Sequence, residues 1–262
     1  MSDIITSLNG AIFEIILNRP DKRNAIRVQM LQDIASAVLQ AEQTNGVRVI
    51  LVRGEGTCFS AGLDLMTMGG MPEALGENWR ELGNEATRLW QRSIQRLQDS
   101  SLPTIALMHS YAIGAGLELA LGCDLRIAAD NTVMSLEETR IGIIPDAGGT
   151  TRLTHLIGAA RAKELIFTGR RIDAPTALHI GIVNQVVSPK ELLEAGQKLA
   201  EEIMLSAPRA VAAAKRVING LHNTAEGFHL EMVEQFPLFH SEDLAEGVQA
   251  RIERRPPNWK GK

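Results

Sequence analysis

The sequence predicts an α/β fold followed by a helical carboxyl-terminal part. In the first half, short runs rich in β-branched residues alternate with stretches of helical periodicity. This alternation recurs along the chain, as expected for strand–helix–strand units around a parallel sheet. After Val187 only helical patterns follow. With 262 residues, 45% of them apolar and 22% charged, the chain is long and apolar enough to bury a sizeable core.

The patterns place the elements of the α/β part in order. They predict strands at 12–17, 48–52, 104–109 and 125–129, and helices at 28–43 and 115–121. Between the second and third strands, residues 66–78 hold three Met and three Gly without stable periodicity. This composition predicts a mobile loop or lid.

Capping signals mark the helices of the second part. Ser188, Pro189 and Glu191 predict a helix start, with apolar residues then following one helical face. Ser206 with Pro208 predicts a second helix, and a last helix starts near Ser241 and stops at the two prolines 256–257. We therefore expect an α/β core over residues 1–195 and a helical region over 196–262.

Composition excludes several classes of function. The formal charge of −4 gives the protein no general reason to bind nucleic acid. No run approaches the roughly 18 apolar residues of a membrane span, and no secretion signal begins the chain. The two cysteines, Cys58 and Cys123, form no disulfide framework, which favours a reducing, cytoplasmic environment.

Familiar catalytic motifs are incomplete. The six histidines lack the spacing of a helical metal site, so no metal is expected. Gly114 and Gly116 resemble a dinucleotide loop, but Leu119 stands where its third glycine belongs. The segment around Ser60 differs from the G-x-S-x-G motif of serine hydrolases, because Cys58 stands in the place of the first glycine.

Two small-residue turns, 59–64 and 113–118, each follow a predicted strand. Small residues let the backbone approach a ligand, and the first N–H groups of a helix have no partner inside the helix. Two such groups directed at one oxygen would stabilise negative charge developing on a carbonyl. The alternative is that glycine and alanine only permit close packing of helix on strand.

Three carboxylates accompany these turns. Glu118 lies on the first turn of the predicted helix and would face a substrate held by the free N–H groups. Glu138 and Asp146 flank a segment that ends in Pro-Asp-Ala-Gly-Gly. Structural roles are the alternatives: a capping residue for Glu118, a solvated strand end for Glu138 and a turn residue for Asp146.

Several motifs in one order resemble the enoyl-CoA hydratase/isomerase (crotonase) family almost from end to end. They occupy residues 16–25, 59–65, 113–124, 142–150, 168–170, 177, 181–183 and 186–187. The resemblance implies a crotonase-type spiral of ββα units and a helical carboxyl-terminal region for trimerisation. Homotrimers, or dimers of trimers, would act on a coenzyme A thioester without a cofactor of their own.

The resemblance also implies roles for single residues. The backbone N–H groups of Ala61 and Ala115 would bind the thioester oxygen. Glu118 and Glu138 match the two glutamates of the hydratases, one activating water for attack at Cβ and the other supplying a proton to Cα. Charge would then appear on the oxygen that the amides hold. We therefore expect an enoyl-CoA hydratase.

Asp146 leaves an alternative open. It matches the position of an acid in the dienoyl-CoA isomerase branch, and Glu138 with Asp146 could move a proton between two carbons without water. A catalytically silent acyl-CoA-binding protein is the third hypothesis, although it would need none of the three acids. The presence of all three acids therefore argues against a silent protein.

The substrate-binding residues are also taken from the resemblance. Coenzyme A is expected beside the turn at 22–26, with its phosphates near basic side chains. Residues 251–262 carry a net charge of +4, and Arg254 stands where the family can place a phosphate-binding lysine, sometimes across a subunit boundary. The full expected set is Lys22, Arg23, Ala25, Ile26, Ala61, Gly62, Asp64, Leu65, Gly114, Pro145 and Arg254.

Overall fold

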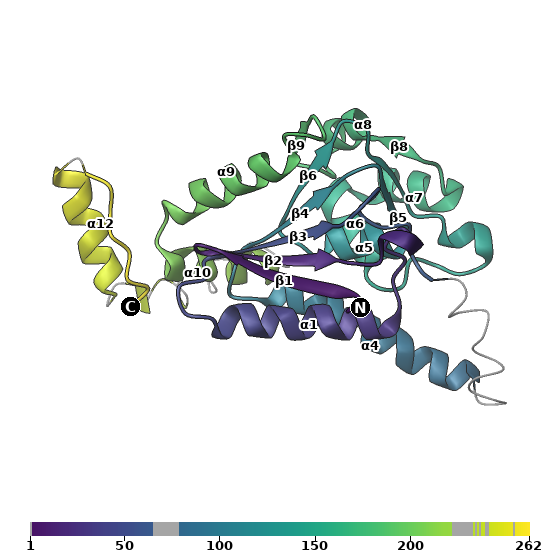
Figure 1. Cartoon of the computed structure of the whole chain (residues 1–262), viewed down its shortest axis with the longest axis horizontal. Coiled ribbons are helices and arrows are strands. Elements are labelled where there is room, and N and C mark those ends of the chain that lie inside the picture. Colours follow the sequence, from purple (N-terminus) through teal and green to yellow (C-terminus); the bar gives the residue numbers. More distant parts are fainter. Residues whose placement is uncertain are drawn as a thin grey trace.

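A computed structural model describes residues 2–64 and 79–221, and in the carboxyl-terminal part residues 233, 235, 237, 238, 241–253 and 255–262. Of these, the side chains at 79–86, 251 and 252 are not described. The predicted loop at 66–78 therefore lies outside the described residues. Figure 1 shows a twisted sheet between layers of helices, with the last helix set apart.

The main sheet has six strands. The first strand pairs with the second in an antiparallel hairpin. From the second strand onward, all neighbouring strands are parallel. In spatial order the strands are β1 (Ile4–Asn9), β2 (Ile12–Leu17), β3 (Val49–Gly54), β4 (Thr104–Met108), β6 (Leu125–Ala129) and β9 (Gln185–Val187). Parallel pairing brings the carboxyl ends of β3 and β4 to one edge, where the two small-residue turns begin.

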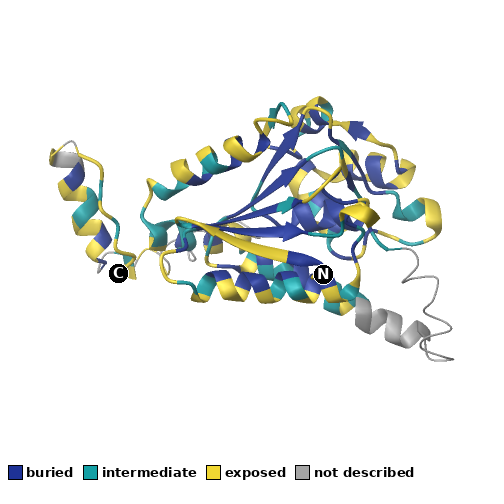
Figure 2. Ribbon diagram, viewed as in Figure 1, coloured by how far each residue is buried: buried dark blue, intermediate teal, exposed yellow. Residues whose placement is uncertain are grey.

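Both faces of this sheet are covered, which explains its nearly continuous apolar strands. Successive β3 residues alternate between two cores. Ile50 and Val52 pack on the side of α1 (Val28–Gln43) and α4 (Trp79–Asp99), whereas Val49 and Leu51 pack on the side of α9 (Leu192–Met204). Figure 2 shows the buried strands between these half-exposed helices.

A second, three-stranded sheet carries the site. It contains β5 (Tyr111–Ile113), β7 (Val133–Ser135) and β8 (Ile172–Asp173), with β5 and β7 parallel. Helix α5 (Ala115–Leu121) starts directly after β5, and the short helix η3 (Glu138–Ile141) follows β7. Because β5 and β7 are paired, α5 with Glu118 and η3 with Glu138 follow neighbouring strands.

The remaining elements surround these two sheets. They are η1 (Pro20–Lys22), α6 (Gly149–Ile157), α7 (Ala159–Thr168), α8 (Ala174–His179), α10 (Pro208–Asn219) and α12 (Glu242–Glu253). Within the described residues, no helix combines the length and apolarity needed to cross a membrane.

The strong sequence patterns correspond to real elements. The predicted helices 28–43 and 115–121 are α1 and α5, and the four predicted strands are β2, β3, β4 and β6 with ends displaced by up to two residues. The helix predicted from Ser188 begins later, at Leu192. Ser188 and Glu191 do bond each other, at 2.6 Å between Oγ and Oε2, but inside the turn that precedes the helix.

Helix α9 runs without a break across the predicted domain boundary between residues 195 and 196. Its buried residues Leu192, Ala195 and Ala200 pack on the main sheet, so the helix belongs to the core. Helix α10 is also anchored to the core. Lys215 is 9% exposed, and its Nζ lies 2.7 Å from the carboxylate of Asp124, just before β6.

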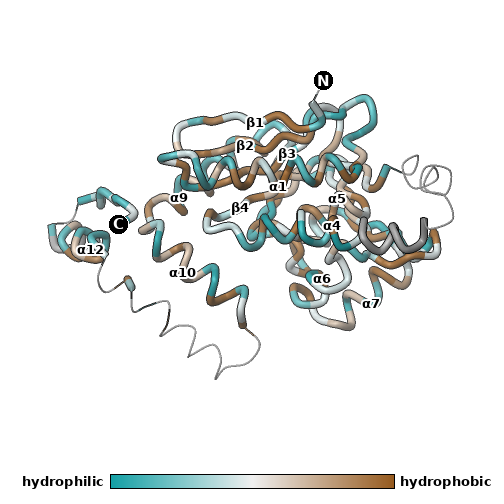
Figure 3. The backbone as a smooth tube through the Cα atoms, turned by 90° about the horizontal axis from the view of Figure 1, so that it is seen from below, coloured by the Kyte–Doolittle hydropathy of each residue, from teal (hydrophilic) through white to brown (hydrophobic). Residues whose placement is uncertain are grey.

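The end of the chain folds back on α12. The buried Asp243 carboxylate accepts the N–H groups of Lys260 and Gly261 at 2.7 and 2.9 Å. The carbonyl oxygen of Lys262 accepts the N–H of Glu242 at 2.9 Å. Figures 1 and 3 both show α12 standing away from the sheet, beyond α9 and α10.

Candidate active site

The first turn is held in place by the buried Asn24. Its side-chain amide donates to the backbone carbonyl oxygens of Glu55 and Cys58, both at 2.9 Å. The backbone carbonyl oxygen of Asn24 accepts a hydrogen bond from the hydroxyl of Ser60 at 2.8 Å. Arg23 and Asn24 have φ of 51° and 52°, in the left-handed region that asparagine tolerates better than most residues. Asn24 therefore fixes the turn at 20–26 against the segment at 55–60, a role the sequence reasoning missed.

The amide of Ala61 is not available to a substrate. Its N–H donates to the carbonyl oxygen of Arg23 at 2.9 Å, which joins the same two segments. The expected role of Ala61 as a donor to the thioester oxygen is thus corrected: this N–H already has its acceptor inside the protein. The methyl group of Ala61 is exposed at the surface of the turn.

The amide of Leu63, two residues on, takes the position that was expected for Ala61. Ile26 donates to Gly62 O at 2.7 Å and accepts from Asp64 N at 2.9 Å, so this parallel bridge leaves the N–H of Leu63 turned away from it. Among the described residues this N–H meets no acceptor. Local sequence could not distinguish residues 61 and 63, because the pairing with Ile26 decides which amide is free.

The N–H of Ala115 is the second free donor. As the first residue of α5 it has no acceptor within the helix, and the described residues supply none from elsewhere. The two turns touch: a Cβ placed on Gly62 would lie 2.7 Å from Ile113 O and 3.8 Å from Ala115 N. The site therefore needs glycine at 62, and it brings the free amides of Leu63 and Ala115 to neighbouring positions.

Glu118 lies one helical turn beyond Ala115 and is 2% exposed. Its Oε1 accepts the N–H of Gly149 at 2.8 Å, at the amino end of α6. Pro145 is buried beside the same point, because a Cβ on Gly149 would lie 2.7 Å from Glu118 Oε1 and 2.8 Å from Pro145 Cβ. Pro145, expected to bind substrate, thus borders the Glu118 carboxyl group.

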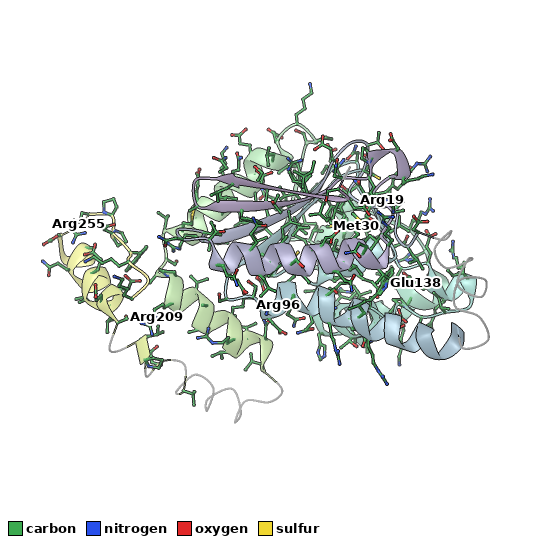
Figure 4. All side chains as sticks on the ribbon, turned by 60° about the horizontal axis from the view of Figure 1, so that its bottom comes forward. Arg19, Met30, Arg96, Glu138, Arg209 and Arg255 are labelled. Atoms are coloured by element: carbon green, nitrogen blue, oxygen red, sulfur yellow. The ribbon has the colours of Figure 1, made fainter. Side chains whose placement is uncertain are left out.

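Glu138, labelled in Figure 4, lies on η3, and its carboxyl group lies beside Gly114 at the amino end of α5. Its Oε1 would lie 2.7 Å from a Cβ on Gly114, whose φ of 51° and ψ of −125° already favour glycine. Its Oε2 is buried and has no hydrogen-bond partner among the described residues. The neighbouring Glu137, by contrast, is bound by Arg171 and Ser135.

Burial controls the protonation of both glutamates. It raises the pKa of Glu118 to about 8, and the nearby carboxylates of Glu138 and Asp146 raise it as well, while the backbone N–H groups of Gly149 and Ala147 oppose the shift. Burial also raises the pKa of Glu138 to about 7, with Asp146 and Glu137 adding to the effect. Near neutral pH the site therefore offers both a proton donor and a proton acceptor.

Asp146 is exposed and is bound to α4. Its carboxylate accepts the hydroxyl of Thr87 at 2.8 Å, and its carbonyl oxygen accepts the side-chain amide of Gln91 at 2.7 Å. It acts on the two glutamates as a nearby negative charge. The structure thus gives Asp146 a bracing role at the turn, whereas its catalytic role stays a prediction.

The other expected substrate-binding residues divide by exposure. Lys22 and Arg23 are exposed beside Ala61, and Ala25 is half-buried. The side chain of Ile26 is fully buried, so this residue supports the site from beneath. Asp64 pairs with Arg19, 3.0 Å between Oδ2 and Nη2. Leu65 and Arg254 lie outside the described residues.

A family model described as enoyl-CoA hydratase/isomerase matches residues 7–262. The chain belongs to the enoyl-CoA hydratase/isomerase family. It is 36% identical to the enoyl-CoA isomerase/hydratase fer4 of Mycosarcoma maydis, covering 99% of this chain and 96% of that protein. It is 38% identical to the carnitinyl-CoA dehydratase of Salmonella typhi, covering 97% of each.

The fold agrees with this membership. The crystal structure of an enoyl-CoA hydratase from Bacillus anthracis superposes with a TM-score of 0.93 at 35% identity, covering 100% of both chains. The predicted crotonase-type α/β fold is therefore confirmed. As a member of the enoyl-CoA hydratase/isomerase family, the protein is an enzyme of the class that acts on acyl-CoA thioesters.

Proposed function

We propose that the protein adds water across the 2,3 double bond of a 2-enoyl-CoA thioester. The observation that carries this proposal is the placement of two carboxyl groups of raised pKa at the amino end of α5, the buried one of Glu118 and the half-buried one of Glu138. The free amides of Leu63 and Ala115 adjoin them. One arrangement thus supplies proton transfer and a site for negative charge.

The proposed reaction follows from these groups. The thioester oxygen accepts the N–H groups of Leu63 and Ala115, and the ionised glutamate removes a proton from water as its oxygen bonds to Cβ. Electron density moves to the thioester oxygen, where the two donors stabilise it. The protonated glutamate then gives its proton to Cα, which completes the addition of H and OH. Which glutamate takes which part stays open.

This reaction uses only the protein and its substrate, so we propose that no cofactor takes part. Coenzyme A enters as part of the thioester, and Lys22 and Arg23 are the exposed cations beside the first turn that would meet its phosphates. The same groups can run the reaction backwards and remove water from a 3-hydroxyacyl thioester.

A silent binding protein fits the site poorly. Burying ionisable carboxyl groups without a full set of partners costs stability, and Glu138 Oε2 has none among the described residues. A binding module would gain nothing from this cost. Isomerisation stays the alternative, since Glu138 and Asp146 could exchange a proton with two carbons of the acyl chain.

The carboxyl-terminal region is proposed to join subunits. In Figure 4, Arg255 and Arg209 lie at the opposite end of the molecule from Glu138, so the basic carboxyl-terminal stretch of one chain does not reach its own site. A trimer, or a dimer of trimers, would bring this stretch to another copy. The exposed apolar side chains Leu244 and Val248 of α12 favour such contact. Sedimentation velocity measures the assembly.

A panel of thioesters tests the proposed reaction. With crotonyl-CoA we expect the absorbance of the conjugated enoyl thioester to fall as water adds. With a 3-enoyl thioester an isomerase would instead create this absorbance, and with a dienoyl thioester it would shift it. No loss from any 2-enoyl chain length, together with a gain from the 3-enoyl substrate, would replace hydration by isomerisation.

A further inference from the structure

Four polar side chains form a stripe along one face of α4. Thr87, Gln91, Gln95 and Gln98 are spaced by four, four and three residues, which places them on the same side of a helix. Each forms a hydrogen bond with the segment 146–152. Thr87 and Gln91 donate to Asp146, whereas the side-chain oxygens of Gln95 and Gln98 accept N–H groups of the Arg152 guanidinium at 2.7 and 2.9 Å.

Arg152 connects this stripe to the loop at 145–149. Besides its two glutamine acceptors, its Nη1 donates to Ala147 O at 3.0 Å. The same nitrogen fills the space beside Gly148, where a Cβ would lie only 1.8 Å away. The guanidinium is therefore fixed by three acceptors on two elements, which restricts the loop directly before α6.

That loop holds Glu118. The residue after Gly148 is Gly149, whose N–H is the hydrogen-bond donor to Glu118 Oε1 at 2.8 Å. We propose that Arg152 is a positioning residue for Glu118, acting through Ala147 and the Gly149 amide with the polar stripe of α4 as its support. The inference rests on the proposed function for its kinetic consequence, but its structural consequence is separate.

The charged groups around Glu118 set the sign of the expected effect. Glu138 from η3 and Asp146 from the loop are carboxylates whose charge raises the pKa of Glu118, and the charge of Glu118 in turn raises the pKa of Arg152 from α6 against the effect of burial. Asp99 of α4 and Cys123 interact with Arg152 in turn. Removing the positive charge of Arg152, or the hydrogen bond from Gly149 N–H, makes the ionised form of Glu118 less stable. Either change is therefore expected to raise the pKa of Glu118.

The test replaces Arg152 by Gln. We expect kcat for crotonyl-CoA hydration to fall by about 10- to 100-fold, with KM changed less than about threefold, because a small displacement of a proton-transfer group slows the chemical step. The pKa of Glu118, followed by ¹³C NMR of labelled glutamate carboxyl groups and assigned with Glu118→Gln, should rise. Arg170→Gln is the matched control, because the guanidinium of Arg170 is exposed and its ion pair within the described part of the chain is with the exposed Glu164 on α7.

Coupling separates positioning from general damage. In the Glu118→Gln background, Arg152→Gln should cause little further loss of kcat, since the residue acts through Glu118. If the losses add, or if the Glu118 titration is unchanged in Arg152→Gln, the proposal is overturned. Should Arg152→Gln fail to fold, Gln98→Met removes one acceptor only, and it must shift the titration in the same direction.

The titration also keeps the two proposals apart. If the parent protein hydrates no 2-enoyl thioester, the proposed function fails, but the NMR titration still reports whether Arg152 controls Glu118. If hydration is observed and the titration of Glu118 does not respond to Arg152, only the positioning role fails.

Discussion

The N–H of Ala61 donates to the carbonyl oxygen of Arg23 at 2.9 Å, and this bond decides which amide of the first turn can serve a substrate. Two residues later the chain pairs with Ile26 in a way that leaves the N–H of Leu63 free. The family motif locates the turn in the sequence. Which amide in the turn is free depends on the hydrogen bond between Ala61 and Arg23, which are nearly forty residues apart in the chain.

Backbone replacement tests this selection. Incorporating the α-hydroxy analogue of leucine at position 63 changes its N–H to an ester oxygen, and we expect kcat to fall about 10²- to 10³-fold, the usual cost of one oxyanion donor. The corresponding alanine analogue at position 61 should lower the melting temperature and change kcat less than about tenfold. The reverse pattern would restore Ala61 as the donor.

The two glutamates should both be needed for turnover. Glu118→Gln and Glu138→Gln keep the side-chain shape but remove proton transfer, so we expect each to lower kcat by about 10²- to 10⁴-fold in the crotonyl-CoA assay. Circular dichroism checks that the fold is kept. Parent-like rates in both variants would show that other groups transfer the protons.

Stability should fall as pH rises because of the same two residues. Their pKa values are raised in the folded protein, to about 8 for Glu118 and about 7 for Glu138. The stability they contribute is complete below the unfolded value near 4.5 and is lost as pH increases through 7 and 8. Melting temperatures between pH 5 and 9 should therefore decline less in Glu118→Gln than in the parent, and equal slopes would contradict the assignment.

Crowding at Gly114 gives a separate test of the site. Gly114→Ala puts a methyl group 2.7 Å from Glu138 Oε1 at a backbone conformation that disfavours a side chain, so Glu138 must move and activity should drop by at least about tenfold. Gly10→Ala is the control. Gly10 also has a positive φ, 58°, but a Cβ there meets nothing within 4 Å, so only stability should respond.

The ion pair between Lys215 and Asp124 should anchor α10. Lys215→Met leaves the Asp124 carboxylate without its cation in a largely buried place, which typically costs about 3–5 kcal/mol, and we expect a clear fall in the urea midpoint. Lys198→Met removes an exposed pair with Glu194 and should leave the midpoint unchanged. Similar shifts in both variants would argue against the anchoring role.

Helical periodicity allowed α1 to be predicted, because it buries one apolar face. The central strands were predicted from their β-branched runs, and α5 from the small residues that follow a strand. Strand β1 was missed, since five of its six residues are exposed and its sequence alternates poorly. Strands β7, β8 and β9 have two or three residues each, too few for a period to appear.

Within the site, Glu118 and Glu138 were identified by residue type and position in their motifs. Asn24 and Arg152 were not, because their importance comes from partners 31 to 57 residues away along the chain. An arginine on a helix carries no local sign that it braces a loop. Only the hydrogen bonds from Arg152 on α6 to Gln95 and Gln98 on α4 reveal it.

The return of the last residues onto α12 affects how the protein is best produced. Because Asp243 binds the amides of Lys260 and Gly261, and Glu242 binds the carbonyl of Lys262, an affinity tag fused after Lys262 would follow directly on residues that are exposed but whose backbone is held by three hydrogen bonds. Ser2 is also exposed, and within the described part of the chain its carbonyl oxygen accepts a single hydrogen bond, from the side-chain amide of Asn18 at 3.0 Å. Purification handles and surface-immobilisation groups therefore belong at the amino terminus.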